Sequence, residues 1–213
     1  MKKYELTAEF IEKWGKKLFR IKALIGFGSV EAGELGGYVE KEDNLAQNGN
    51  AWVFDDAEVY GNARVYGNAE VYGNAWVFDD AWVFDDARVY DDAEVYGNAR
   101  VYGNAEVYGN ARVCGNAEVY GNARVYDDAD YLLIGRIGSR FSFTTFFKNK
   151  DKGITVSCGC FLGTIAEFRA KVTDTHGNNK HAKMYNLAAD MAELQILGEE
   201  HFDKLNTNKS EPF

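Results

Sequence analysis

The sequence predicts a mainly β protein built around a three-sided parallel β-helix, with an N-terminal cap and a C-terminal α+β module. Two observations support this prediction. First, six residues of the form Val-aromatic-(Gly-Asn or Asp-Asp)-Ala-X repeat thirteen times between Val53 and Asp130. Such a period is typical of solenoids, in which stacked coils share one core. Second, the outward charges alternate in sign at a spacing of eighteen residues, which indicates three six-residue sides per coil.

The charge pattern decides the number of sides, because residues that stack in successive coils are cross-strand neighbours. Charged residues twelve apart are alike in sign, whereas those eighteen apart are opposite. The eighteen-residue pairs are Glu70/Arg88, Arg88/Glu106, Glu94/Arg112, Arg100/Glu118, Glu106/Arg124 and Arg112/Asp130. The same spacing places the Asp-Asp corners at 79–80, 85–86 and 91–92 between Gly-Asn corners, so no acidic corner would stack on another and repel it.

Alternation along each short side predicts which residues fill the interior. Val and Ala suit a narrow core, so the aromatic residue after each Val and the residue before it should point outward. The outer surface would then carry three aromatic ladders beside three charge ladders, with Cys114 replacing one tyrosine. Gly, Asn and Asp at the corners accept the left-handed backbone that a sharp turn needs.

The repeat and its flanks predict three parts: a β-rich cap over residues 1–34, the β-helix over 35–130, and a ββαα module over 131–213. Within the cap we expect short strands and one helical turn. The strands are predicted at Lys3–Leu6, Leu18–Ile21 and Leu24–Phe27, and the turn at Glu9–Trp14.

A degenerate first coil is predicted to begin near Leu35. Continuing the six-residue phase toward the N-terminus places Leu35 at the Val position. It places Val39, Leu45 and Ala51 at the Ala position. These small and apolar residues would extend the core of the solenoid toward the cap.

The C-terminal module is predicted from a hairpin and two helices. Arg140–Phe147 and Gly153–Phe161 read as the hairpin strands. Thr164 with Glu167 makes a capping box for the first helix, and the second helix should run over 179–197. The predicted apolar sides are Ile165, Phe168 and Val172 on the first helix and Met184, Leu187, Met191 and Leu194 on the second.

The repeat text resembles a known group of proteins. Val at position i with Ala at i+4 resembles the left-handed β-helix of hexapeptide-repeat proteins, and the resemblance covers residues 51–130. Preceded by Gly-Gly-Tyr-Val-Glu-Lys-Glu-Asp-Asn-Leu at 36–45, the repeat looks like bacteriophage and prophage proteins of this type. The resemblance implies the left-handed sense of the coils and a phage origin.

The enzymes best known in this family are acyltransferases and γ-type carbonic anhydrases, and both use histidine. The predicted solenoid has none, since the three histidines are His176, His181 and His201. No loop interrupts the thirteen repeats to form a substrate pocket. We therefore expect a non-enzymatic protein without a cofactor.

We also expect no metal. Cys158 and Cys160 lie two apart on one predicted strand, and with His176 and His181 they could form a zinc site. The favoured interpretation is packed cysteines and surface histidines, because Cys-X-Cys is not a common zinc spacing. The Asp-Asp corners offer too few carboxylates at one point for calcium.

Charge and aromatic content point to a protein-binding surface. Residues 51–130 carry sixteen acidic and five basic side chains in a chain of net charge −9, so this solenoid is poorly suited to bind DNA directly. Trp and Tyr are enriched at interface centres, although stacking that stabilises the solenoid explains them equally well. The candidate partner-binding or oligomer surface is Trp76, Phe78, Asp79, Asp80, Trp82, Phe84, Asp85, Asp86, Tyr90, Asp91, Asp92, Tyr96 and Tyr102.

The resulting hypothesis is a non-enzymatic, phage-type binding protein that blocks a host macromolecule. That macromolecule would be an antiviral defence component, with an anti-CRISPR role as one example and a nucleic-acid-binding enzyme as one target. One alternative is a structural rod that assembles side to side or end to end. Another is a sponge that sequesters a small nucleotide at a basic cluster made of Arg136, Arg140, Lys148, Lys150 and Lys152.

Composition sets the expected location and assembly. The chain has no apolar run long enough for a membrane span and no signal-peptide pattern at residue 1, and its three cysteines give no disulfide framework. We expect a cytoplasmic protein of the bacterial host cell. Exposed aromatic ladders favour a homo-oligomer, a trimer by analogy with hexapeptide-repeat enzymes or a dimer.

Overall fold

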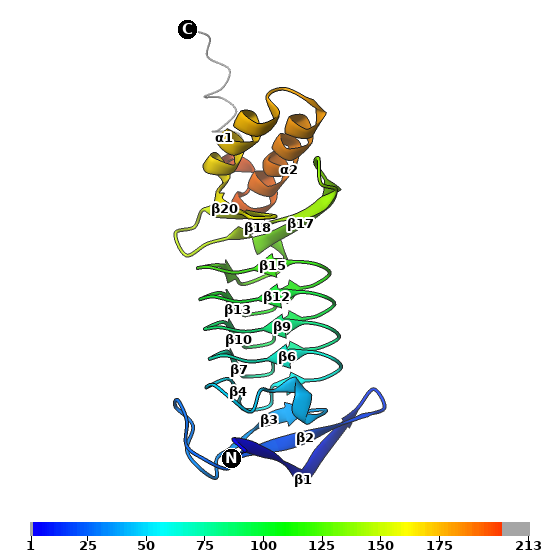
Figure 1. Cartoon of the computed structure of the whole chain (residues 1–213), viewed down its shortest axis with the longest axis vertical. Helices are drawn as coiled ribbons and strands as arrows, with labels where there is room; N and C mark the ends of the chain where they lie inside the picture. The colour runs from blue at the N-terminus through cyan, green and yellow to red at the C-terminus, as the bar shows by residue number, and fades with distance from the viewer. Residues whose placement is uncertain (1, 202–213) are drawn as a thin grey trace. The chain divides into compact units, whose positions relative to one another are not determined.

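A computed structural model describes residues 2–201 of the chain. The chain forms two compact units, of which the first ends at Asp128 and the second begins at Ala129 (Figure 1). The predicted cap and the predicted β-helix therefore belong to one compact unit. The end of the predicted C-terminal module, residues 202–213, lies outside the described residues.

The first unit is a β-solenoid of about five turns. Its thirteen two-residue strands form three parallel stacks, and each strand from β4 to β13 pairs with the strand eighteen residues later, for example Arg88 with Glu106. This register confirms three sides per coil. The strands are β4 (Trp52–Val53), β5 (Glu58–Val59), β6 (Arg64–Val65), β7 (Glu70–Val71), β8 (Trp76–Val77), β9 (Trp82–Val83), β10 (Arg88–Val89), β11 (Glu94–Val95), β12 (Arg100–Val101), β13 (Glu106–Val107), β14 (Arg112–Val113), β15 (Glu118–Val119) and β16 (Arg124–Val125).

Val and Ala form the solenoid core as predicted. From Ala51 to Val125, every Val and Ala of the repeat is at most 1 % exposed. From Asp55 to Gly121, the corner residue after each aromatic adopts a positive φ, for example 58° at Asp79 and 70° at Gly61. Asp and Gly are both suited to this left-handed conformation, which explains why they share the corner position.

The outward aromatic residues form stacked ladders. Tyr66, Phe84 and Tyr102 lie parallel, with ring centroids 4.8 and 4.7 Å apart, and the other two sides repeat the arrangement. The rings cover one another's faces, so most of them are half-buried. The ladders therefore contribute packing within the solenoid as well as surface.

The charge ladders are confirmed on the coils. Arg88 lies 3.7 Å from Glu70 and 3.9 Å from Glu106, and Arg124 lies 3.3 Å from Glu106. The Arg112/Asp130 pair stays a prediction. The coil ends in the 3-10 turn η2 (Asp128–Asp130), and buried Asp130 pairs with Lys148 at 2.6 Å.

The cap differs from its prediction. Its core is an antiparallel hairpin of two long strands, β1 (Tyr4–Lys13) and β2 (Lys16–Ala23), which joins β3 (Leu35–Val39). The predicted helical turn at Glu9–Trp14 is instead strand and hairpin turn, and Leu24–Phe27 forms only one isolated bridge. Pairing along the whole hairpin outweighs the weak helical pattern of residues 9–14.

In the first coil, Val39 and Leu45 do not occupy the repeat position that was predicted for them. Val39 pairs with Val59 and Leu45 with Val65, so both occupy the Val position rather than the Ala position. Leu35 pairs with Lys22 of the hairpin and is exposed. Two extra residues between Leu45 and Val53 cause the shift, since these neighbouring Val positions lie eight residues apart. The 3-10 turn η1 (Glu42–Asn44) lies between the first two sides of this coil.

The second unit has four strands rather than the predicted two, and residues 199–201 are helical in addition to the two predicted helices. The antiparallel sheet runs in the order β17 (Tyr131–Ile137), β18 (Ser142–Lys148), β19 (Ile154–Cys158), β20 (Phe161–Thr164). The predicted hairpin is the β18–β19 pair. Helix α1 (Ile165–His176) begins with the predicted Thr164/Glu167 capping box, and α2 (Lys180–Leu197) begins at an Asn179 cap.

The buried side of α2 is not the one predicted. Tyr185, Ala189, Ala192 and Ile196 face the core of the second unit. The four larger apolar residues of the other side are between 39 % and 63 % exposed. They are Met184, Leu187, Met191 and Leu194, and we call them the α2 stripe. Small alanines let the helix pack closely on the sheet, which a pattern based on large side chains does not reveal.

Candidate functional site

The predicted aromatic surface is divided by the cap. On the β8 side, the ring of Trp14 at the hairpin turn lies edge-on to Trp76 at 5.2 Å, and the Lys13 ammonium lies 5.0 Å from the Trp76 ring centroid. Trp14 also lies against Tyr60, which stacks on Phe78. The β8 side is therefore partly occupied by the chain's own residues.

Two other outward positions are covered in the same way. Trp52 and Glu58 precede a Val, and the repeat predicts that they point to solvent. Both are buried by the cap, at 0 % and 3 % exposure, and Glu58 pairs with Lys13. Sequence periodicity cannot reveal this covering, because Lys13 comes from a hairpin about forty residues earlier in the chain.

Trp82, on β9, lies on a side that the β1–β2 hairpin leaves open. Its half-buried ring lies between the guanidinium groups of Arg64 and Arg100, at 5.9 and 5.1 Å from the ring centroid. Tyr66 meets its edge at 6.2 Å. Arg64 and Arg100 stack one coil before and one coil after Trp82, so the eighteen-residue spacing places both cations.

Two shallow hollows adjoin Trp82, with volumes of about 280 and 520 Å³. Trp82, Arg64 and Asp43 line both. Asp80 contributes to the smaller hollow and Glu42 to the larger. Trp82 and Asp80 belong to the contact surface that the sequence predicts, whereas Arg64 and the η1 residues do not. Arg64 lies eighteen residues before Trp82, and this spacing alone predicts that the two side chains are neighbours on successive coils.

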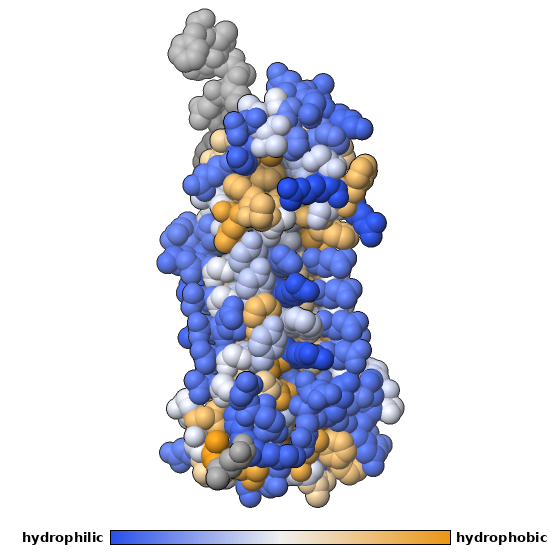
Figure 2. All heavy atoms as spheres, viewed as in Figure 1, coloured by the Kyte–Doolittle hydropathy of each residue, from blue (hydrophilic) through white to orange (hydrophobic). Residues whose placement is uncertain are grey.

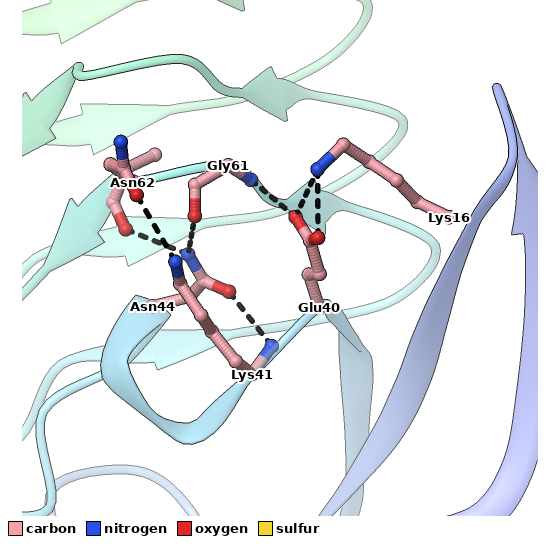
Figure 3. A network of polar contacts seen from close by, with 7 residues as sticks. Lys16, Glu40, Lys41, Asn44, Gly61 and Asn62 are labelled. Atoms are coloured by element: carbon pink, nitrogen blue, oxygen red, sulfur yellow. Dashed lines mark hydrogen bonds and ion pairs between the residues drawn. The ribbon is translucent and has the colours of Figure 1, made fainter.

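A polar network fixes the edge of these hollows (Figure 3). The Asn44 side-chain amide donates to the carbonyl oxygens of Gly61 and Ala63, at 3.2 and 2.9 Å. Glu40 accepts from the Lys16 ammonium at 2.7 Å and from the Gly61 N–H at 2.7 Å. Burial opposes ionisation of Glu40, but these hydrogen bonds hold the pKa of its carboxyl below the usual value. The network anchors η1 to the solenoid corner.

Two acidic corners border the Trp82 side at the level of β9. Asp79 and Asp80 precede the strand, and Asp85 and Asp86 follow it. All four are exposed, and none forms an ion pair with any residue from 2 to 201. Asn62 donates to Asp80 at 3.1 Å and Asn68 to Asp86 at 3.0 Å, so each of these carboxylates has a neutral partner.

Of the remaining predicted surface residues, Tyr102 stacks on Phe84 on the Trp82 side, and the others lie elsewhere. Asp91 and Asp92 form the corner between β10 and β11. The β10 side also lies between two acidic corners, but its central residue is Arg88, which is paired with Glu70 and Glu106. The Trp82 side therefore combines an aromatic centre with unpaired carboxylates at both edges. We call Trp82, Phe84, Asp80 and Asp86, with Arg64 and Asp43, the Trp82 surface. The ladder residues Tyr90, Tyr96 and Tyr102 lie one on each of the three sides.

The predicted basic cluster does not come together. Arg136 lies near the end of β17 and Arg140 precedes β18, whereas Lys148 ends β18 and Lys150 and Lys152 lie in the following turn. A seven-residue strand spans about 20 Å, which separates the two groups. Lys148 also forms an ion pair with buried Asp130. Arg140 lines a cavity of the second unit.

The cysteine–histidine set is also rearranged. Cys158 ends β19 and Cys160 follows Gly159, whose φ of 62° turns the chain, so the two cysteines do not share a strand. The rings of His176 and His181 lie 5.9 Å apart. Among residues 2–201, no three His, Cys, Asp or Glu side chains are arranged to hold a metal ion.

The family described as YdcK Beta solenoid repeat matches residues 57–71 and 93–109. The coils are similar to that β-solenoid repeat. The match covers part of the solenoid and neither the cap nor the second unit. A search of curated proteins gave no match.

The solenoid surface is largely hydrophilic on the side that Figure 2 presents, with blue and pale side chains and few orange ones. This agrees with charged and corner residues outside and Val and Ala inside. Within the part of the chain that the structure describes, no helix has the length and apolar character of a membrane span.

Proposed function

We propose that the chain is a non-enzymatic binding protein that uses the Trp82 surface to hold a basic surface of a host macromolecule and block it. The best candidate is a nucleic-acid-binding component of bacterial antiviral defence, as expected of a phage-encoded inhibitor. The observation that carries the proposal is a half-exposed Trp between two acidic corners that have no ion-pair partner among residues 2–201.

Both features favour a protein partner. A half-exposed Trp that lines two hollows provides the aromatic anchor typical of an interface hot spot. Carboxylates at the rim attract basic side chains and speed association, an effect that falls as salt is added. A nucleic acid would be repelled by the same carboxylates, whereas a protein groove that binds nucleic acid carries the complementary charge.

The first prediction concerns capture of that partner. Trp82→Ala should weaken capture of a basic host protein from bacterial lysate at least tenfold, because it removes the anchor. Asp80→Asn with Asp86→Asn should weaken capture to a similar degree and reduce its salt dependence. Quantitative mass spectrometry of affinity-captured protein measures both effects.

The matched control is Asp91→Asn with Asp92→Asn, which removes the same charge from the corner that does not border β9. This control should capture the partner as the unchanged chain does. Equal capture by all three variants, or equal loss in all three, would exclude the Trp82 surface as the binding site.

We also propose that two copies of the chain associate through the α2 stripe. Its four residues follow spacings of three, four and three, as in the a and d positions of a coiled coil. The aromatic ladders are poorer candidates, because their rings already cover one another. The stripe is the more exposed apolar surface.

An antiparallel two-fold contact makes the stripe self-complementary. It sets Met184 opposite Leu194 of the second copy and Leu187 opposite Met191. It also brings exposed Lys180 near Glu199 of the second copy. Lys180, Lys183, Glu199 and Glu200 form no ion pair with other described residues. Positive residues at the start of α2 would therefore meet negative residues that follow the end of α2 in the second copy, which favours this antiparallel orientation.

The second prediction tests this contact. Leu187→Lys with Met191→Lys should convert a dimer to a monomer in analytical ultracentrifugation, because two lysines would face each other across the seam. Tyr90→Ser, Tyr96→Ser and Tyr102→Ser together change all three ladders and should leave the dimer intact. A monomeric unchanged chain, or a dimer broken by the tyrosine changes alone, would contradict the α2 contact.

A further inference from the structure

The second unit contains a cavity of about 390 Å³ that the proposed function does not use. Its apolar wall includes Phe161, Phe168 and Tyr185. Phe168 meets Tyr185 edge-on at 5.6 Å and lies 5.6 Å from Phe161. His176 stacks on Tyr185 at 5.8 Å. An aromatic wall of this kind suits a planar ring, and the volume is that of a small-ligand site.

The ionisable side chains of Arg, Lys and His type that line this cavity are all basic. Arg140, Lys171 and His176 line it, and no Asp or Glu does so among the residues that the structure describes. Asp174 lies 3.3 Å from the Lys171 ammonium, and this pair is exposed to solvent. The chain as a whole has a net charge of −9, whereas the charged lining of this cavity is basic. A basic lining favours binding of an anion.

Neutral donors complete the cavity. Ser139, Ser142 and Thr175 contribute hydroxyl groups. Burial, followed by the neighbouring Cys158, raises the pKa of the Tyr185 phenol to about 12, so this group keeps its proton and adds no negative charge at neutral pH. Hydroxyl groups beside two permanent cations suit a phosphate, which has several acceptor oxygens and up to two charges.

We propose that this cavity binds a phosphate monoester joined to a planar ring, of the size of a nucleoside monophosphate. The ring would lie against Phe161, Phe168 and Tyr185, and the phosphate would be held by Arg140 and Lys171. These residues come from the β17–β18 connection, β20, α1 and α2, so only the folded unit assembles them. The proposal is independent of the Trp82 surface.

The third prediction uses AMP as the probe with the full chain. Calorimetric titration should detect AMP binding, and adenosine and inorganic phosphate should each bind at least tenfold more weakly. Arg140→Gln with Lys171→Gln should weaken AMP binding at least tenfold, because both cations that hold the phosphate are removed. Trp82→Ala should leave AMP binding unchanged.

The matched control is Lys150→Gln with Lys152→Gln, which removes the same charge from the hairpin turn. It should bind AMP as the unchanged chain does. The proposal fails if neither AMP nor UMP binds, if adenosine binds as tightly as AMP, or if the control loses as much affinity as the cavity variant. Circular dichroism of both variants confirms that each is folded before titration.

Discussion

Trp52→Ala is expected to lower the free energy of unfolding by about 3–5 kcal/mol, the range for removing a large buried aromatic side chain. Trp52 is fully buried where the cap covers the first coil. Its ring meets Tyr4 at 6.0 Å and Phe27 at 5.3 Å, both edge-on. Alanine would leave a cavity and remove these contacts between the cap and the first coil.

Urea unfolding followed by circular dichroism measures this loss. Trp82→Ala is the matched control, because it removes the same side chain from a half-exposed position and should cost about 1 kcal/mol or less. Partial opening of the cap in the Trp52 variant would also expose strand edges and promote aggregation. Equal losses in the two variants would show that the cap does not depend on Trp52.

A second large effect is expected at alkaline pH, where the tyrosine ladders should destabilise the fold. Burial, followed by nearby Glu106 and Glu118 respectively, raises the pKa of Tyr90 and of Tyr102 to about 12. Burial also raises the pKa of Tyr66 and Tyr72. Between pH 10 and 12 the unfolded chain loses these protons while the folded chain keeps them. Stability is therefore complete below pH 10 and falls as the pH rises toward 12.

The measurement is an alkaline titration followed by both circular dichroism and tyrosinate absorbance. The two signals should change together, because ionisation requires the ladder to open. Tyr90→Phe with Tyr102→Phe should move the transition to higher pH, since Phe78 and Phe84 show that phenylalanine stacks equally well in these ladders. Ionisation with a midpoint near pH 10 in a chain that stays folded would contradict the account.

The regular part of the fold could be predicted from sequence because one residue pattern controls every coil. The opposite charges of Glu70 and Arg88 fix the eighteen-residue register, and pairing between β7 and β10 follows it. The cap could not be predicted in this way. Two extra residues before Val53 shift the phase of Val39 and Leu45, and nothing in the repeat signals that shift.

The candidate sites depend on contacts between distant residues. Trp76 and Trp82 have the same position in the repeat, and only the hairpin that brings Trp14 onto Trp76 distinguishes them. Arg140 and Lys171 line the same cavity in the second unit although they are far apart in the sequence. The basic cluster predicted from neighbouring sequence positions therefore did not include the right pair. On α2, the alanine-rich face is buried, whereas the face with the larger apolar side chains, which was expected to be buried, is exposed.

The most direct test of the proposed binding function is native mass spectrometry of the tagged chain purified gently from bacterial cells, recorded over a range of ionic strengths. The account predicts a complex with a basic host protein that is abundant at low ionic strength and declines as salt rises. It also predicts that this complex is absent for Trp82→Ala and present for Asp91→Asn with Asp92→Asn. The chain alone or its dimer alone, with no host protein at any ionic strength, would contradict the proposed function.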